Sequence, residues 1–277
     1  MKNRSEMVLK AFLSRCPEET RRALERFLPE NERLYLAELP SFSEGEISPF
    51  PPLMDRVHWS WFLPTLKSFS AREQRLFLAS LHPLMAENLR RELQIKSDEG
   101  QIGEVAGDFL RQQLLSSLAG AHNRHLPIDY LPASPLNRLL YSNKKDLIRL
   151  IDLLALYDLA ADMRQIVETK ILKKIYSFLS EEQKNFLKKI SSQKETHTLP
   201  RMGLERWDGS EEALRVLLHK RGLARLGIAL SGQDPDLIWA ICHQLDIGRG
   251  NALFKLCGKE AAAGISEAAI RQIEEIV

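Results

Sequence analysis

The stretch GLARLGIALSGQDPDLIWAICHQLDIGRG, residues Gly222–Gly250, decides the fold class of this chain. Its second half, Leu237–Leu245, is apolar around almost the whole circumference of a helix, which is typical of a buried central helix. The residues ahead of it, Asp234-Pro235-Asp236, supply an N-cap, a first-turn proline and an acid near the positive end of the helix dipole. The stretch therefore predicts a helix enclosed by other helices.

The same helical period continues through most of the chain, and alternating strand-like runs are scarce. One apolar stripe contains Leu147, Ile151 and Leu154, with a break expected near Tyr157-Asp158. Capping-box spacing begins helices at Ser70 and Ser180. Gly232 and Gly248 are expected to end helices in the left-handed conformation. These patterns predict an all-α fold.

Three segments share a helix-entry pattern in which an aromatic residue precedes the start and an aromatic-Leu pair follows on the buried face. They are residues 26–39, 68–81 and 177–190. Stacked helical hairpins would produce this pattern, and so would hydrophobic staples in unrelated helices. We expect two or three packed helical units with helical-hairpin stacking.

Two proline-rich or aperiodic segments divide the chain. The expected organisation is an N-terminal helical segment (1–40), a proline-rich connector (41–55), a central helical domain (56–190), a linker (191–209) and a C-terminal helical unit (210–277).

Bulk composition excludes several classes of protein. The 277 residues carry 39 basic and 37 acidic side chains, so no global field points to nucleic acid or an anionic membrane. The three cysteines form no CxxC pair, which favours a reducing cytoplasm over a disulfide framework or a zinc module. Neither a signal peptide nor a membrane span is expected.

No reactive constellation stands out. Cys242-His243 has the residue types of a nucleophile and a base, but adjacent helical residues point about 100° apart, so packing is expected instead. His122 and His125 lack a third ligand at metal spacing. We therefore predict no catalytic, cofactor-binding or metal site. The rival hypothesis is an enzyme whose site is assembled from remote residues such as His122, Asp129 and His219.

Two features are candidates for binding a partner. Lysines concentrate between Lys170 and Lys194, where a solvated face, an acidic protein partner or RNA would each explain them. Trp59 and Trp61 follow the connector and are not expected to enter one core together. The candidate partner-binding residues are Trp59, Trp61, Lys173, Lys174, Lys188 and Lys189.

The segments SPLNRLL (134–140), DLIRLI (146–151) and Gly222–Leu245 resemble the SctK family of type III secretion accessory proteins. The resemblance covers roughly the C-terminal half. It implies a non-enzymatic bacterial adaptor of the injectisome sorting platform, cytoplasmic and peripheral to the inner membrane through the secretion-system base. It also implies protein partners: the cytoplasmic domain of an SctD-like ring protein, and SctQ-like and SctL-like components.

Two alternatives to this adaptor remain open. The paired helices also resemble the flagellar switch protein FliG, which would make the chain a helical scaffold of another kind. An RNA-binding helical protein would use the face from Lys170 to Lys194, and its affinity would fall steeply with salt.

Overall fold

The computed structural model describes residues 4–39, 53–96, 102–119, 131–191, 202–204, 207–258 and 264–277. These residues are helical and contain no strand, which confirms the all-α prediction. In chain order the elements are α1 (Arg4–Arg15), α2 (Glu18–Glu25), α3 (Glu30–Glu38), α4 (Leu53–Arg56), η1 (Trp59–Trp61), α5 (Leu63–Lys67), α6 (Ala71–Ser80), α7 (Pro83–Leu93), α8 (Glu104–Ala119), η4 (Pro135–Tyr141), α9 (Lys144–Met163), α10 (Thr169–Phe178), α11 (Glu181–Ser191), α12 (Glu211–Leu230), α13 (Pro235–Gln244), α14 (Ile247–Cys257) and α15 (Ile265–Ile276).

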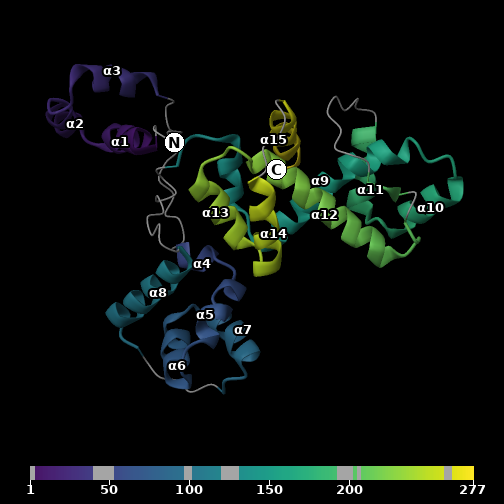
Figure 1. Ribbon diagram of the computed structural model, residues 1–277, viewed down its shortest axis with the longest axis horizontal. Helices are drawn as coiled ribbons and strands as arrows, with labels where there is room; N and C mark the ends of the chain where they lie inside the picture. The colour runs from purple at the N-terminus through teal and green to yellow at the C-terminus, as the bar shows by residue number, and fades with distance from the viewer. Residues whose placement is uncertain are drawn as a thin grey trace. The chain divides into compact units, whose positions relative to one another are not determined.

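The chain divides into two compact units (Figure 1). Unit 1 contains residues 1–137 and 234–240, and unit 2 contains residues 138–233 and 241–277. Much of the predicted connector (41–55) and linker (191–209) lies outside the described residues, although the end of the connector forms α4. The domain boundaries expected from the sequence stay predictions.

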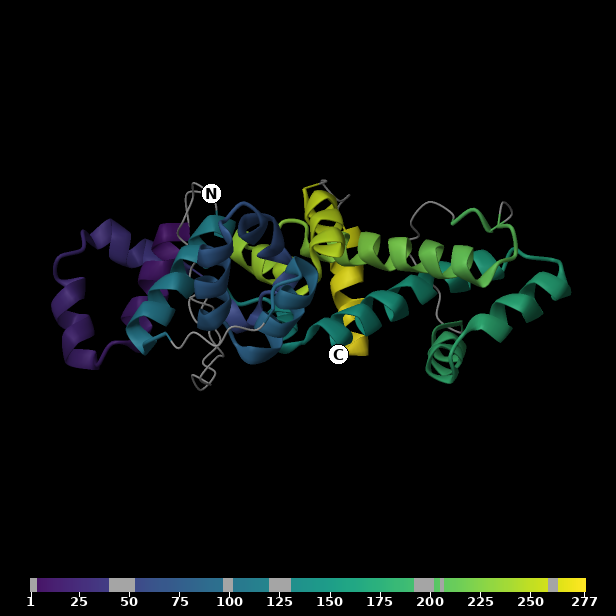
Figure 2. The same cartoon turned by 90° about the horizontal axis from the view of Figure 1, so that it is seen from below.

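Unit 2 is built around two long helices, α9 and α12, which pack side by side (Figures 1 and 2). Two glycines of α12 permit its close approach to α9 and to α14. A Cβ added to Gly222 would lie 1.8 Å from the carbonyl oxygen of Ile151 on α9, and one added to Gly227 would lie 2.6 Å from Cβ of Leu256 on α14. Any larger residue would push the helices apart, because packed interiors leave no spare volume.

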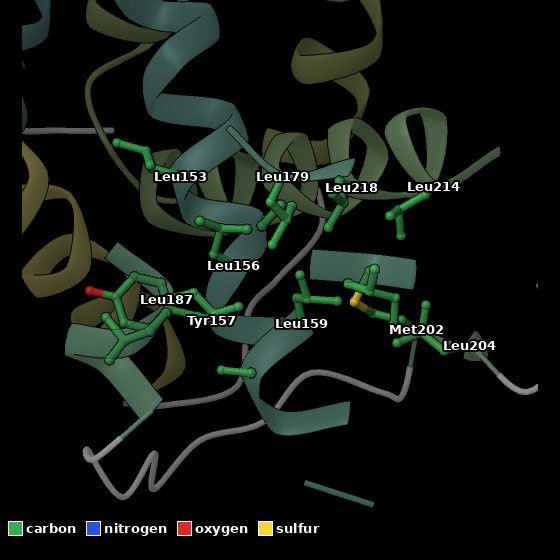
Figure 3. Close-up of a cluster of buried hydrophobic side chains, with 14 residues drawn as sticks. Leu153, Leu156, Tyr157, Leu159, Leu179, Leu187, Met202, Leu204, Leu214 and Leu218 are labelled. Atoms are coloured by element: carbon green, nitrogen blue, oxygen red, sulfur yellow. The ribbon is translucent and has the colours of Figure 1, made fainter. Parts of the chain in front are cut away.

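The core of unit 2 explains why α9 is apolar around most of its surface. Its residues are buried on several sides, by α11, α12 and α15 (Figure 3). The break predicted near Tyr157-Asp158 is wrong, since α9 continues to Met163. Tyr157 packs edge-on against Phe186 of α11, with ring centroids 5.7 Å apart. Asp158 points into an internal ion pair, so a polar residue here does not interrupt the helix.

The helices α4 to α8 form a separate core in unit 1. Its fully buried side chains include Phe62, Leu66 and Leu89. Trp239 of α13 packs against this cluster and is half-buried.

Helix starts follow the predicted capping signals. Ser70 and Glu73 exchange side-chain and backbone hydrogen bonds in a capping box, and Ser180 and Gln183 do the same. Asp234 accepts from the backbone N–H of Asp236 at 2.8 Å. Gly232 has the predicted positive φ of 80°. The same prediction for Gly248 is wrong, because Asp246 caps the start of α14 and Gly248 lies in its first turn.

The first three helices have little interior. Pro17 and Pro29 precede α2 and α3, where a missing N–H costs nothing. The buried side chains described here are Leu13, Leu36 and Leu39. In Figure 1, α2 lies at the turn between α1 and α3.

None of the helices that the structure describes is long and apolar enough to cross a membrane.

Candidate functional site

Helices α10 and α11 present a charged surface to solvent because their apolar sides enter the core of unit 2. Ile175, Leu187 and Ile190 are the buried anchors of these two helices. The opposite faces carry the lysine surface, which we define as Lys170, Lys173, Lys174, Lys184, Lys188 and Lys189. The four lysines predicted to bind a partner, at positions 173, 174, 188 and 189, are all exposed.

The acids next to the lysine surface are held in local pairs. Lys184 bonds Glu181 at 2.7 Å and holds the pKa of that carboxyl below its usual range. Arg149 of α9 pairs with Glu182, which raises the pKa of the guanidinium. Both acids of the α11 start are therefore matched by these partners, and the lysine surface keeps a net positive charge. Such exposed pairs contribute little to folding stability.

The two candidate tryptophans lie in the short helix η1. Both are half-buried and pack against the core of unit 1. The expectation that they could not enter one core together is wrong, because both rings pack against the same core cluster. His58 Nδ1 lies 2.8 Å from the Ser60 hydroxyl and fixes the turn. Whether either ring also contacts a partner stays a prediction.

The Cys242-His243 pair is interior. Cys242 is fully buried and His243 is 7% exposed. The Cys242 thiol contacts the thiol of Cys257, and this contact together with burial raises the pKa of Cys242. A thiol kept protonated is a poor nucleophile. The predicted packing role of Cys242 is confirmed by its burial.

Of the residues in the rival enzyme hypothesis, His122 and Asp129 lie outside the described residues, as does His125. His219 is described, on α12, and sits in a polar cluster that the sequence did not reveal. Asp152 of α9 lies 3.3 Å from His219 Nδ1, and Arg249 of α14 donates from Nε to His219 Nε2 at 3.0 Å. The sequence gives only a weak signal for this cluster, since α9, α12 and α14 each contribute a single residue to the hydrogen bonds of His219.

The hydrogen bonds of this cluster fix the form of the imidazole. Since Arg249 donates to Nε2, that nitrogen carries a lone pair, and the proton belongs on Nδ1, which donates to Asp152. Both ring nitrogens of His219 are therefore engaged. The cluster ties three helices together, and the lone pair on Nε2 of His219 is already occupied by the hydrogen bond from Arg249.

Asp246 extends the cluster and caps α14. Its carboxylate accepts from the Arg249 backbone N–H at 3.2 Å and from the Arg249 guanidinium at 2.6 Å, and Lys144 lies 3.3 Å away. Burial alone would raise the pKa of Asp246. The bonds from Arg249 and the charge of Lys144 outweigh it and lower the pKa to about 2.

A second polar network is fully internal. Arg225 of α12 bonds Asp158 of α9 at 2.7 Å and Gln272 of α15 at 2.6 Å, and its guanidinium lies over the Tyr157 ring. Arg221 lies 3.2 Å from the second oxygen of Asp158. That distance makes an ion pair, although the angle does not give a hydrogen bond. The network fixes the register of α9, α12 and α15, and nothing in it faces solvent as a reactive group would.

Two further features of the described part of the chain bear on metal and small-molecule binding. No cluster of three or more His, Cys, Asp or Glu residues there could hold a metal ion. An open hollow of about 530 Å³ in unit 1 is lined by Asp55, His82, Asp108 and Arg111 among others. Arg111 is already bonded to Asp108 and to the Ser80 carbonyl, so it is a structural tie between α6 and α8.

Comparison with known proteins adds no relative. No protein-family model, no curated protein and no solved structure matches the chain.

Proposed function

We propose that this chain is a non-enzymatic adaptor of a type III secretion sorting platform. It would link an SctD-like inner-membrane ring protein to the SctQ-like cytoplasmic complex. The observation that carries the proposal is the place of the stretch Gly222–Leu245, on which the resemblance to the SctK family rests. Its residues form the second half of α12 and all of α13 and serve packing: Gly222 and Gly227 set helix spacing, and Cys242 fills the interior.

An adaptor of this kind works by geometry. Buried contacts hold the helices of unit 2 rigid, and exposed charges select a partner. The lysine surface is the binding surface that we assign to unit 2. Its side chains stand on helices anchored by Ile175 and Leu187, so the positive charges keep a fixed spacing. The expected partner surface is acidic.

The test is co-purification of the full chain with SctD and SctQ homologues from secretion-competent cells. A deletion of residues 210–277 would remove α12 and α15, which pack on α9, and would disrupt unit 2. A charge reversal is sharper: Lys173, Lys174, Lys188 and Lys189 all changed to Glu. All four are exposed, so the fold should persist while capture of one partner is lost.

The matched control reverses exposed cations elsewhere, Lys67→Glu with Arg72→Glu in unit 1. This control should retain both partners. Recovery of neither homologue by the unaltered chain would contradict the secretion role. Retention of both by the quadruple variant would contradict the role of the lysine surface.

RNA binding is a second candidate, which the clustered lysines favour. It predicts affinity for a single-stranded RNA that falls steeply as salt rises and that disappears in the quadruple variant. The lysine surface carries no tryptophan, and its helices turn Tyr176, Phe178 and Phe186 toward the core of unit 2. Because base stacking on aromatic side chains supplies much of single-strand affinity, an acidic protein is the better fit.

A further inference from the structure

Two of the three cysteines of the chain lie in contact inside unit 2. Cys242 stands in the last turn of α13, and Cys257 is the last residue of α14. Their thiols are hydrogen-bonded to each other, and both cysteines are buried and not joined in a disulfide. Because the two residues belong to different helices, tertiary packing brings the sulfurs together.

This contact offers chemistry that packing does not need. A buried cysteine packs as a small hydrophobic residue, and a single one against an apolar neighbour would fill the same space. Two thiols in contact can be joined by oxidation with little movement of the helices that carry them. Cys16 lies in unit 1, so the pair is complete within unit 2.

The two thiols of the pair are not equivalent. Cys242 is fully buried, whereas Cys257 keeps 8% of its surface exposed. The Cys242 thiol donates the hydrogen bond and retains its proton. That bond lowers the pKa of the Cys257 thiol, and burial opposes the change only in part. Since the thiolate is the form that reacts with peroxides, Cys257 is the nucleophile of the pair.

A small oxidant can reach Cys257 from the end of α14. The helix stops at this residue, and Gly258, which follows it, is exposed and has no side chain to cover the sulfur. Cys242 lies deeper, with none of its surface exposed. A small peroxide therefore meets Cys257 first.

We propose that Cys242 and Cys257 form a peroxide-reactive dithiol site, in which Cys257 is oxidised first and Cys242 converts it to an intramolecular disulfide. The Cys257 thiolate attacks one oxygen of hydrogen peroxide, and the O–O bond breaks. A sulfenic acid forms on Cys257, and the departing hydroxide takes up the proton that the thiol had released, giving water. This inference goes beyond the secretion role and does not depend on it.

Cys242 completes the reaction. Oxidation of Cys257 removes the thiolate that held the proton on Cys242, so the neighbouring thiol can attack the sulfenic sulfur. An S–S bond forms, the S–O bond breaks, and the hydroxyl group leaves with the Cys242 proton as a second water. Two thiols are thus oxidised while one peroxide is reduced to two waters. The disulfide ties the end of α13 to the far end of α14, whereas the chain itself connects α13 only to the start of α14.

The test is oxidation of the folded, fully reduced chain with hydrogen peroxide, followed by alkylation of the remaining thiols and tryptic digestion. Arg249 and Lys255 lie between the two cysteines, so trypsin separates them unless a disulfide joins the fragments. We expect mass spectrometry to find the Cys242 and Cys257 peptides linked, with the mass of two hydrogens lost. Reduction with dithiothreitol should reverse the change.

Single substitutions separate the two roles. Cys242→Ala leaves no resolving thiol, so a sulfenic acid should accumulate on Cys257 and be trapped by dimedone when the protein is unfolded. Cys257→Ala leaves the buried partner alone, and oxidation at position 242 should slow by at least about tenfold. Cys16→Ala is the matched control and should form the link as the unaltered chain does. Circular dichroism checks that each variant keeps its helical signal.

The unaltered chain decides the proposal even if a variant does not fold. In the folded state the link should join only positions 242 and 257, whereas in urea links to Cys16 should appear as well. Absence of the 242–257 link in folded protein whose Cys16 has been oxidised overturns the proposal. So does a folded chain that gives the same mixture of links as the urea-unfolded chain, or a Cys257→Ala variant in which Cys242 is oxidised as fast as before.

Discussion

The helices α9 and α12 of unit 2 and the helices α1 to α3 of unit 1 place their charged residues differently. In unit 2, Arg225 and Asp158 are 4% and 3% exposed and pair with each other inside the core. In α1 to α3 the ion pairs lie on single helices at the surface, as between Arg22 and Glu18. Apolar side chains differ in the same direction: Leu156 of α9 is fully buried, whereas Leu34 of α3 is 64% exposed.

This difference teaches that helical period alone does not specify a core. Unit 2 is held by close helix approach at glycines, by buried leucines and by a matched internal charge network. The N-terminal helices have the period and the prolines at their starts, but described apolar side chains such as Phe27 and Leu34 remain exposed. The predictions below contrast substitutions in the two regions or inside unit 2.

The largest effect is expected for Arg225→Leu. It leaves Asp158 in the core with Arg221 as its remaining ion-pair partner, and breaking a buried pair costs about 3–5 kcal/mol. Arg215→Leu on the same helix is the control, since Arg215 pairs with Glu211 at the surface and should cost less than about 0.5 kcal/mol. Urea unfolding measures both. Equal costs would show that the internal network does not hold unit 2.

Truncation of leucines compares the two regions directly. Leu156→Ala should cost about 3 kcal/mol, because it removes buried methyl groups and leaves a cavity. Leu34→Ala should change the unfolding free energy by less than about 0.5 kcal/mol. A large loss from Leu34→Ala would mean that α1 to α3 already possess a core.

Glycine substitutions test the spacing of the helices. Gly222→Ala should cost about 2–3 kcal/mol, since its Cβ would collide with the Ile151 carbonyl. Gly248→Ala, in the first turn of α14 and with only ordinary contacts, should be neutral or slightly stabilising. The melting temperatures of the Gly222→Ala and Gly248→Ala variants, measured by thermal unfolding, test this difference. The spacing argument fails if the two variants melt together.

The smallest effect is a pH-dependent one at Asp246. Its folded pKa of about 2 lies below the ordinary 3.8. The carboxylate therefore stabilises the fold above pH 3.8, and this contribution is lost as the pH falls through 2. Asp246→Asn keeps a capping residue and should lower stability by about 1–2 kcal/mol at neutral pH. The deficit should vanish in strong acid. A deficit that is constant with pH would contradict the assignment.

Much of the fold could be predicted because its signals are local. Capping residues at Ser70 and Ser180 and the all-round apolarity of Leu237–Leu245 depend only on neighbouring residues. The break wrongly expected at Tyr157-Asp158 shows the limit. A polar residue inside a helix looks like an end until the arginines of α12, 63 and 67 positions away, are known to neutralise it.

The candidate surfaces were predictable to different degrees. The lysine surface follows from helical spacing, because lysines opposite an apolar stripe must face solvent. The sequence could not show that Trp59 and Trp61 both pack against one core, because this depends on the tertiary contacts of the short helix η1. The His219 cluster joins three helices through single residues at positions 152, 219 and 249. No spacing in the sequence predicts that these three side chains are in contact.

Hydrogen–deuterium exchange of the full chain, followed peptide by peptide, tests the central contrast most directly. We predict that α9 and α12 exchange slowest. Amides of α1 to α3 should exchange faster than these, because few of their described side chains are buried. Protection of α1 to α3 equal to that of α9 would contradict the account.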